Sequence, residues 1–361
     1  MKQKIFFFTH FPPPVHGFSS VNKFIYDKLI ENGSFEIVKF SFIKKSDSRF
    51  IFYINRVIRS LNSLYLILKN YRSARNSIFY MPVSGGFGMA FEILPWLLAG
   101  LIFKKRIMHH HSFQYCYKYS VLMNIMQMFQ KKGTYNIFLC KCHLKKFNDQ
   151  YPIVINNVSI ISNEMTLSRD YIKTPLRRKP FKKDDIVVGH LSNLSVEKGF
   201  LVFCELVEKL GADGNIKFEL AGPTTDPEIL LVIEKLTTKF PETFTYRGSI
   251  YNTEKMLWYR SLDFFIFPSS YNNETYPLVV SEAILSDVIP LSTAIGCLPE
   301  FNHKDFTFSI ETFVDNVLAI LINTSNDETH YENLKSNLLL VKEQALEKSE
   351  KDIRKLIDLF I

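Results

Sequence analysis

The stretch from Asp263 to Glu300 constrains the fold of this chain more than any other part of the sequence. It opens with an almost wholly apolar run, Asp263–Phe267, which predicts a buried strand. A helical pattern from Leu278 to about Ser286 follows, and then a second apolar run, Val288–Ser292. Pro277 suits the first position of that helix, where a missing N–H costs nothing. The stretch therefore predicts a βαβ unit, whose helix begins at the sheet edge where α/β proteins bind ligands, phosphates among them.

Two carboxylates bracket the start of this helix, with seven residues between them. Glu274 lies in the loop before the helix, and Glu282 lies about one turn inside it. The neighbours of Glu282 are mostly apolar, and an ionised carboxylate is costly there unless a hydrogen-bonding group satisfies it. Ligand hydroxyls would do so. Alternatively, Glu282 shares a thin polar stripe with Ser281 and Ser286 and faces water.

The spacing Glu274-x7-Glu282, with Pro290 and Gly296-Cys-Leu-Pro-Glu300 after it, resembles the signature of retaining glycosyltransferases of family 4, which have the GT-B fold. The resemblance implies that the first Glu is a catalytic residue at the donor sugar and that the second binds the ribose of the nucleotide. It also implies that the residues after the first Glu present backbone N–H groups to the donor diphosphate. In this chain they are Tyr276, Leu278 and Val279.

The sequence departs from the family pattern at two positions in this stretch. Tyr276-Pro277 stands where Phe-Gly or Phe-Pro is usual, and Cys297 replaces the second glycine of a Gly-Gly pair. The second departure leaves a side chain near the predicted donor site.

A loop in the second half of the chain, Ser192–Gly199, resembles the family's Gly-Arg-Leu-Ser-x-Glu-Lys-Gly motif. The resemblance makes Lys198 the lysine that neutralises the diphosphate. A lysine at a helix start is disfavoured by the helix dipole, so a bound anion would explain it; otherwise Lys198 is a solvated surface lysine. Asn193 stands where the family usually has Arg, which removes one positive charge from the predicted donor-binding site.

Two residues in the first half are assigned by the same resemblance. Gly17 follows the first predicted strand and a proline-rich loop, where the family often has a glycine against the donor diphosphate; His16 is a weaker candidate. His111 ends the predicted strand Arg106–Ser112, where family enzymes often carry a histidine near the donor sugar. Alternation puts His109 and His111 on one face of that strand, so a metal site and an ordinary sheet-edge histidine stay open as alternatives.

The length of 361 residues is sufficient for two domains. The resemblance implies an α/β protein with two Rossmann-like domains that face each other across a cleft. We expect an N-terminal, acceptor-side domain over residues 1–165, a linker over 166–183 and a nucleotide-sugar-binding domain over 184–345. The last segment, 346–361, is expected to form a helix that crosses back to the first domain.

The net charge of +8 is unevenly distributed, because residues 1–165 carry a balance of +15 and residues 166–361 a balance of −7. The basic residues are scattered through predicted helices without a nucleic-acid motif. An anionic membrane surface is therefore the favoured partner of the first domain, rather than nucleic acid. The stretch Ser48–Arg72 mixes aromatic and basic residues at helical spacing. It predicts either an amphipathic helix packed on the sheet or a helix that lies partly on a membrane.

The apolar runs of the first domain indicate where in the cell the protein is expected to lie. The run at the N-terminus is too short for a signal peptide. The longest run, Phe87–Phe103, is short for a membrane span and predicts a buried helix. We therefore expect a cytoplasmic protein that is peripheral on the inner face of the membrane.

The resemblance therefore implies a retaining glycosyltransferase of the hexosyltransferase type. It would move a sugar from a nucleotide-sugar donor to a glycan or lipid-linked acceptor in the assembly of a bacterial-type surface polysaccharide, such as lipopolysaccharide or capsule. The chain has no Asp-x-Asp motif, so neither a metal nor another cofactor is expected. Two alternatives stay open: another GT-B enzyme, such as a sugar-nucleotide epimerase or a glycoside phosphorylase, and a catalytically silent sugar-nucleotide-binding subunit.

Overall fold

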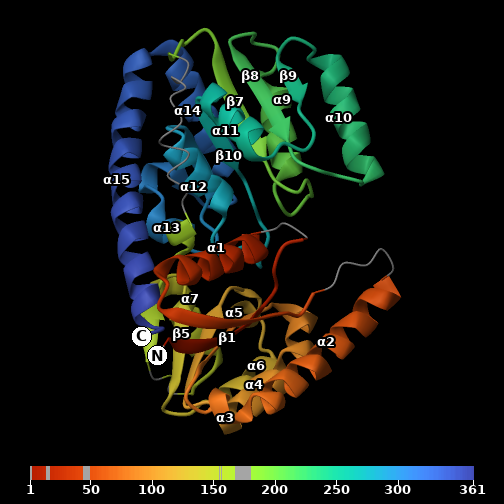
Figure 1. Cartoon of the computed structure of the whole chain (residues 1–361). Helices are drawn as coiled ribbons and strands as arrows, with labels where there is room; N and C mark the ends of the chain where they lie inside the picture. The colour runs from red at the N-terminus through yellow and green to blue at the C-terminus, as the bar shows by residue number, and fades with distance from the viewer. Residues whose placement is uncertain (1, 14–16, 44–48, 154, 156, 167–179) are drawn as a thin grey trace. The chain divides into compact units, whose positions relative to one another are not determined.

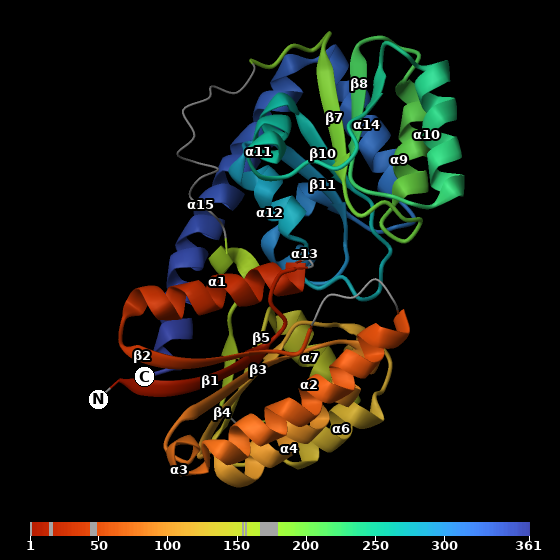
Figure 2. The same ribbon diagram turned by 45° about the vertical axis from the view of Figure 1, so that its right-hand side comes forward.

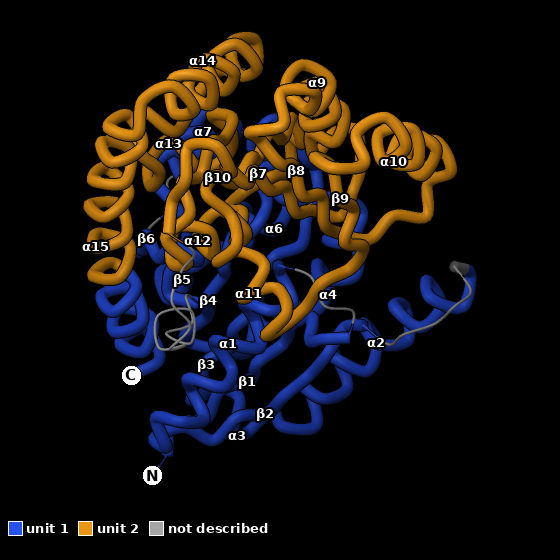
Figure 3. The backbone as a smooth tube through the Cα atoms, turned by 90° about the horizontal axis from the view of Figure 1, so that it is seen from above, with its two compact units in different colours: residues 1–166, 349–361 blue, residues 167–348 orange. Residues whose placement is uncertain are grey.

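The computed structural model describes the whole chain except residues 1, 14–16, 44–48, 154, 156 and 167–179. The chain forms two compact units: unit 1 comprises residues 1–166 and 349–361, and unit 2 comprises residues 167–348 (Figure 3). Each unit contains its own six-stranded sheet with helices packed against it (Figure 1). The predicted α/β class with two Rossmann-like domains is confirmed. Most of the predicted linker lies outside the described residues.

The sheet of unit 1 is parallel throughout, with the strand order β2-β1-β3-β4-β5-β6. Its strands are β1 (Gln3–Thr9), β2 (Phe35–Ser41), β3 (Ile78–Val83), β4 (Lys105–His110), β5 (Thr134–Phe138) and β6 (Val158–Ile160). Phe6, Phe7 and Phe8 of β1 are fully buried, because a central strand of a parallel sheet is covered on both faces. The order changes direction between β1 and β3, which marks the ligand-binding edge of such sheets.

Three helices of unit 1 lie side by side on one face of this sheet, and α1 (Gly17–Asn32) covers the opposite face (Figures 1 and 2). The three are α2 (Arg49–Lys69), α4 (Ile93–Ile102) and α6 (Val121–Met128). Shorter elements complete the unit: α3 (Tyr71–Ala74), η1 (Gly86–Phe91), α5 (Gln114–Tyr117), α7 (Lys141–Gln150) and η2 (Asn163–Thr166).

The apolar run Phe87–Phe103 differs from the expected buried helix. It consists of η1 followed by α4, and three of its side chains are substantially exposed, namely Phe87 (68%), Leu94 (49%) and Leu101 (74%). Within the part of the chain that the structure describes, no helix is both long enough and apolar enough to cross a membrane.

The C-terminal helix α15 (Glu328–Asp358) begins in unit 2, and its last turns belong to unit 1. Asp352 on this helix is buried and accepts hydrogen bonds from the backbone N–H of Ser162 (2.8 Å) and from its hydroxyl (2.7 Å). The ring of Phe360 packs against those of Phe35 and Tyr80, with centroids 6.3 and 5.5 Å away. These contacts make residues 349–361 an integral part of the core of unit 1.

The sheet of unit 2 is also parallel, with the order β12-β11-β10-β7-β8-β9. Its strands are β7 (Ile186–Leu191), β8 (Ile216–Ala221), β9 (Phe244–Tyr246), β10 (Phe264–Phe267), β11 (Ile289–Thr293) and β12 (Thr307–Phe308). Its helices are α9 (Phe200–Leu210), α10 (Pro227–Lys239), α11 (Asn252–Ser261), α12 (Leu278–Leu285), α13 (Leu298–Phe301), η3 (Lys304–Phe306) and α14 (Phe313–Asn326). The predicted βαβ unit is present as β10, α12 and β11.

Candidate functional site

The loops after β7 and β10 meet at the point where the strand order of unit 2 reverses, the position at which open α/β sheets bind ligands. The backbone N–H of Ser270 donates to the carbonyl of Glu197 at 2.9 Å, which joins the two loops. Gly199 is required here, because its φ is +86° and a β-carbon would lie 2.4 Å from the carbonyl oxygen of Pro268. The loop that carries Lys198 is therefore held directly against the loop that carries Glu274.

Lys198 and Glu274 form an ion pair at this edge, with 25% and 12% of their side chains exposed. The Nζ atom of Lys198 also lies 4.4 Å from the ring centroid of Tyr271. Lys198 is therefore not a solvated surface lysine; it has an anionic partner within the protein. The resemblance assigned Lys198 to the diphosphate and Glu274 to the donor sugar. In the structure these two side chains lie together and bind each other.

Glu282 of α12 is also paired, and its partners come from α11. Lys255 Nζ lies 2.6 Å from one carboxylate oxygen, and the hydroxyl of Tyr259 lies 3.3 Å from the other. The alternative that Glu282 shares a solvent-facing polar stripe with Ser281 and Ser286 is excluded, because both serines are buried. Sequence reasoning missed Lys255 and Tyr259. Their spacing of four residues puts them on one helix face, but nothing local indicates that this face meets α12.

Helix α12 starts at Leu278, as predicted, but Pro277 is the extended residue before the helix rather than its first residue. No residue in the described ranges accepts a hydrogen bond from the N–H of Leu278 or Val279, whereas Val280 donates to the carbonyl of Pro277. The side chain of Tyr276 is buried and stacks on Phe301 at 4.2 Å, so it serves packing. The helix start is therefore a set of donors on a firmly packed support.

Gly296 packs against the loop that carries Glu274 and Thr275. Its φ is +58°, and a β-carbon would lie 2.6 Å from the carbonyl oxygen of Glu274 and 2.5 Å from that of Thr275. The N–H of Cys297 donates to Thr275 at 2.8 Å, and Cys297 is buried. The Gly-Cys pair therefore fixes the backbone that positions Glu274.

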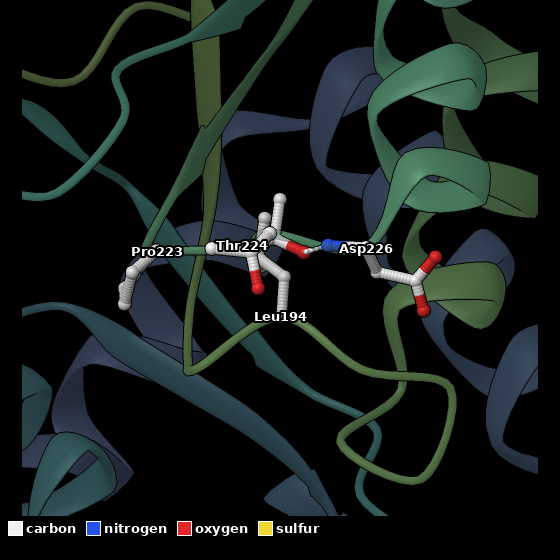
Figure 4. A pocket seen from close by; sticks show the side chains of 5 residues that line it. Leu194, Pro223, Thr224 and Asp226 are labelled. Carbon is white, nitrogen blue, oxygen red and sulfur yellow. Dashed lines mark hydrogen bonds between the residues drawn. The ribbon is translucent and has the colours of Figure 1, made fainter. Parts of the chain in front are cut away.

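Asn193 is exposed in the loop after β7, next to the buried Leu194. An open pocket of about 290 Å³ adjoins this loop, lined by Leu194, Pro223, Thr224, Thr225 and Asp226. Figure 4 shows Leu194 pointing from its own loop toward Thr224, while the carboxylate of Asp226 points away. The pocket is at the same edge of the sheet as Lys198, since all its residues follow β7 or β8.

The remaining predicted site residues are in unit 1. Gly17 is the first residue of α1, and a β-carbon there would meet nothing within 4 Å, so packing does not require glycine. His16 lies outside the described residues. His111 follows β4 directly, because that strand ends at His110 rather than at Ser112. Burial lowers the pKa of His111 to about 3, so its imidazole is neutral at pH 7.

The rings of His109 and His111 lie 3.9 Å apart, in agreement with the predicted alternation. Across the described part of the chain, no group of three or more His, Cys, Asp or Glu side chains is placed to hold a metal. The metal alternative for these histidines therefore has no third ligand among those residues.

A comparison with known protein families shows which family unit 2 resembles. Residues 173–338 match the family model described as glycosyl transferases group 1. This part of unit 2 is similar to the glycosyl transferases group 1 domain. The matched region contains Lys198, Glu274, Glu282 and the start of α12. A sequence search of curated proteins finds no match.

Solved structures are similar in fold to nearly the whole chain. Anabaena HepE in complex with UDP is 11% identical, with a TM-score of 0.66 over 99% of this chain and 100% of that one. Sucrose-phosphate synthase from Thermosynechococcus elongatus is 12% identical, with a TM-score of 0.63 over 99% and 100%. WaaG, a glycosyltransferase involved in lipopolysaccharide biosynthesis, is 12% identical, with a TM-score of 0.62 over 98% and 99%. At such identities the likeness establishes the fold, which is GT-B.

Proposed function

We propose that the protein is a retaining glycosyltransferase of family 4 that transfers a sugar from a nucleotide-sugar to a glycan or lipid-linked acceptor. The observation that carries this proposal is the meeting of Lys198 and Glu274 beside the start of α12, within the region that is similar to a group 1 domain. A cation and unpaired backbone N–H groups suit a diphosphate, and a partly exposed carboxylate suits sugar hydroxyls. HepE has been solved with UDP, so uridine diphosphate sugars are the first donors to test.

Each residue of the proposed site has a separate role in the reaction. Lys198 and the N–H groups of Leu278 and Val279 stabilise the negative charge that develops on the diphosphate as the bond to the anomeric carbon breaks. The electron pair of that bond goes to the phosphate oxygen. The acceptor oxygen forms the new bond, and its proton leaves with the diphosphate. Glu274 holds the sugar hydroxyls, Glu282 the ribose, and His111 orients the sugar.

Two experiments on the same reaction test this assignment. Proton NMR of the products should show release of the nucleoside diphosphate and a product with the anomeric configuration of the donor. Turnover should be unchanged by excess EDTA and by added magnesium or manganese, because Lys198 and the helix start supply the charge that a metal would otherwise supply. If chelation abolishes turnover and a divalent ion restores it, the diphosphate site is assigned wrongly.

We also propose that unit 1 docks on an anionic membrane through α2, on the cytoplasmic side where nucleotide-sugars are made. The helix is inverted relative to an ordinary surface helix. Among its described residues, the buried ones are three polar residues, Arg56, Ser60 and Ser63, and one apolar residue, Ile67. Its outer face instead carries nine large apolar side chains that are 42–75% exposed, namely Phe50, Ile51, Tyr53, Ile54, Val57, Ile58, Leu61, Tyr65 and Leu68. An exposed apolar patch of this size indicates an interface.

The charge around this face selects a membrane as its partner. Residues 37–148, which include α2, α4 and α6, contain 18 Lys and Arg but only 2 Asp and Glu. One of the two acids, Glu92, is buried. Apolar side chains would insert between lipid headgroups, and each basic residue near an anionic surface contributes about 1 kcal/mol. The acceptor proposed above would then be presented at the same surface.

Vesicle cosedimentation should confirm this docking. Wild-type protein should bind vesicles of phosphatidylethanolamine and phosphatidylglycerol, and the binding should weaken as salt rises. The double variant Val57→Glu, Leu61→Glu should bind at least tenfold more weakly. Leu231→Glu, an equally exposed position in unit 2 (52%), is the matched control and should bind like wild type. Equal binding to phosphatidylcholine vesicles, or no binding to either kind, would count against the proposal.

A further inference from the structure

A cluster of charged side chains lies at the switch point of unit 1, between β1 and β3, and the donor-site assignment does not use it. His10 follows β1, Ser84 follows β3, Arg56 comes from α2, and Glu92 precedes α4. Arg56, His10 and Glu92 have relative exposures of 8%, 5% and 0%. Ligands of open α/β sheets bind at such switch points, so the position itself makes this cluster a candidate site.

Glu92 organises the cluster. Its carboxylate accepts hydrogen bonds from the backbone N–H of Ser84 at 2.9 Å and from the hydroxyl of Ser84, and it lies 3.3 Å from Nε2 of His10. Arg56 Nη2 lies 3.4 Å from the same His10 nitrogen and 3.4 Å from the carbonyl oxygen of Gly88. Glu92 is therefore fully engaged inside the protein. It fixes the orientation of His10 and balances the charge of Arg56.

Two polar atoms of this cluster are left for a ligand. Nε of Arg56 is buried and has no hydrogen-bond partner among the residues that the structure describes. The contacts of His10 with Glu92 and Arg56 both involve Nε2, so its other ring nitrogen, Nδ1, is not used by this pair. A buried donor without a partner costs about 1–3 kcal/mol, so a ligand that satisfies it would gain affinity.

Aromatic rings form the rim of the cluster. The guanidinium of Arg56 lies 4.7 Å from the ring centroid of Phe91. The rings of Tyr53 and Phe87 lie within 6.4 Å of that ring and of each other, and they are 49% and 68% exposed. Exposed aromatic faces beside a few convergent polar groups are the composition of a small-molecule site.

The cluster is also one ring away from His111, the residue assigned to the donor sugar. His10 packs edge-on against Phe18 at 5.3 Å, and Phe18 packs edge-on against His111 at 5.1 Å. A ligand on His10 and Arg56 would therefore lie next to the histidine at which the reaction is proposed to occur.

We propose that His10, Arg56, Tyr53 and Phe87 form the subsite for a pyranose ring of the acceptor. The inference rests on the proposed function and specifies its acceptor. The charges of Arg56 and Glu92 cancel, which favours a neutral hydroxyl-bearing ring over a phosphate. Its hydroxyls bond Nε of Arg56 and Nδ1 of His10, and its apolar face lies on Phe87 or Tyr53. Glu92 is a positioning residue.

Ligand-observed NMR with a panel of methyl hexopyranosides tests the subsite without vesicles. At least one methyl pyranoside should bind the wild-type protein. Its dissociation constant should rise tenfold or more in Phe87→Ala and in Arg56→Met. Tyr65→Ala, an exposed aromatic further along α2 (64%), is the matched control and should change the constant less than twofold. Glu274→Gln should also leave it unchanged, which separates this subsite from the donor-sugar subsite.

The outcomes separate this inference from the proposed function. If the wild-type protein is stabilised by UDP but binds no methyl pyranoside, the subsite is wrong and the donor site stands. If pyranosides bind but no nucleoside diphosphate does, the proposed function fails. Phe87 is exposed, so Phe87→Ala should fold normally. Wild-type binding of the pyranoside by this variant would overturn the subsite, even if Arg56→Met fails to fold.

Discussion

Replacing Glu274 with glutamine should lower the rate of sugar transfer at least tenfold and yet leave the protein able to bind UDP at least as tightly as wild type. Glu274 is proposed to bind the sugar, and a charged hydrogen bond to a ligand contributes roughly 1.5–3 kcal/mol, or tenfold and upward. In the structure, however, the same carboxylate pairs with Lys198. A diphosphate must displace it, and glutamine, which carries no charge, competes less.

The second carboxylate should behave in the opposite way. Glu282→Ala should chiefly weaken donor and UDP binding, again by tenfold or more, because Glu282 is proposed to hold the ribose. Steady-state kinetics and calorimetric titration with UDP measure both effects. Glu208→Gln, which breaks the exposed pair with Lys239, is the control and should change neither. Wild-type kinetics in Glu274→Gln and Glu282→Ala, at matched stability, would contradict the site.

Acid should unfold unit 1 before unit 2. His109, His110 and His143 are fully buried, and burial lowers the pKa of all three, that of His110 to about 3. The folded state therefore keeps them neutral while the unfolded chain binds protons below about pH 6.5. Their contribution to stability is full above that pH and is lost as the pH falls. The loss increases with each of these histidines that binds a proton only in the unfolded chain.

Among the described residues of unit 2, the comparable group is His190, whose pKa burial lowers to about 4. Since domains are stable by only about 5–15 kcal/mol, the three buried histidines should make unit 1 the more acid-sensitive of the two units. Hydrogen exchange at pH 7.5 and pH 5.0, compared after correction for the intrinsic rate, should show lost protection in β4 and β5 while β7 and β8 stay protected. His143→Gln should reduce the pH dependence, and His303→Gln should not. Equal loss in both units would contradict this account.

The local structure around the donor site was predictable from the sequence because it depends on residues close together in the chain. The apolar run ending at Phe267, the proline before Leu278 and the helical pattern after it specify β10 and α12 without reference to other parts of the chain. The spacing between Glu274 and Glu282 also indicated that both carboxylates lie near the start of α12.

The partners of those residues were not predictable in the same way. Lys198 was expected to require a bound anion, and the structure supplies Glu274 from 76 positions away. Glu282 was expected to bond a ligand or water, and it meets Lys255 from another helix. Periodicity indicates which side chains share a face of one element, but it does not indicate which faces of two elements meet.

Helix α2 shows a further limit of the sequence pattern. Its spacing predicted a helix with two alternatives, packing on the sheet or lying on a membrane. The structure shows that the side packed on the protein carries Arg56, Ser60, Ser63 and Ile67, and that most of the large apolar side chains are outside. The hydrophobic pattern of a helix shows that it has an apolar face, but not whether that face meets the protein or another surface.

The most direct test of the central claim is thermal unfolding in the presence of UDP, GDP or ADP. At one hundred times its dissociation constant, a nucleoside diphosphate that binds the folded state stabilises it by about 2.7 kcal/mol. We expect at least one of the three to raise the unfolding midpoint of the wild-type protein and of Lys239→Met, a lysine in an exposed ion pair. The same nucleotide should have little effect on Lys198→Met. If none of the three stabilises the wild-type protein, or if one stabilises Lys198→Met equally, the site at Lys198 does not bind the donor.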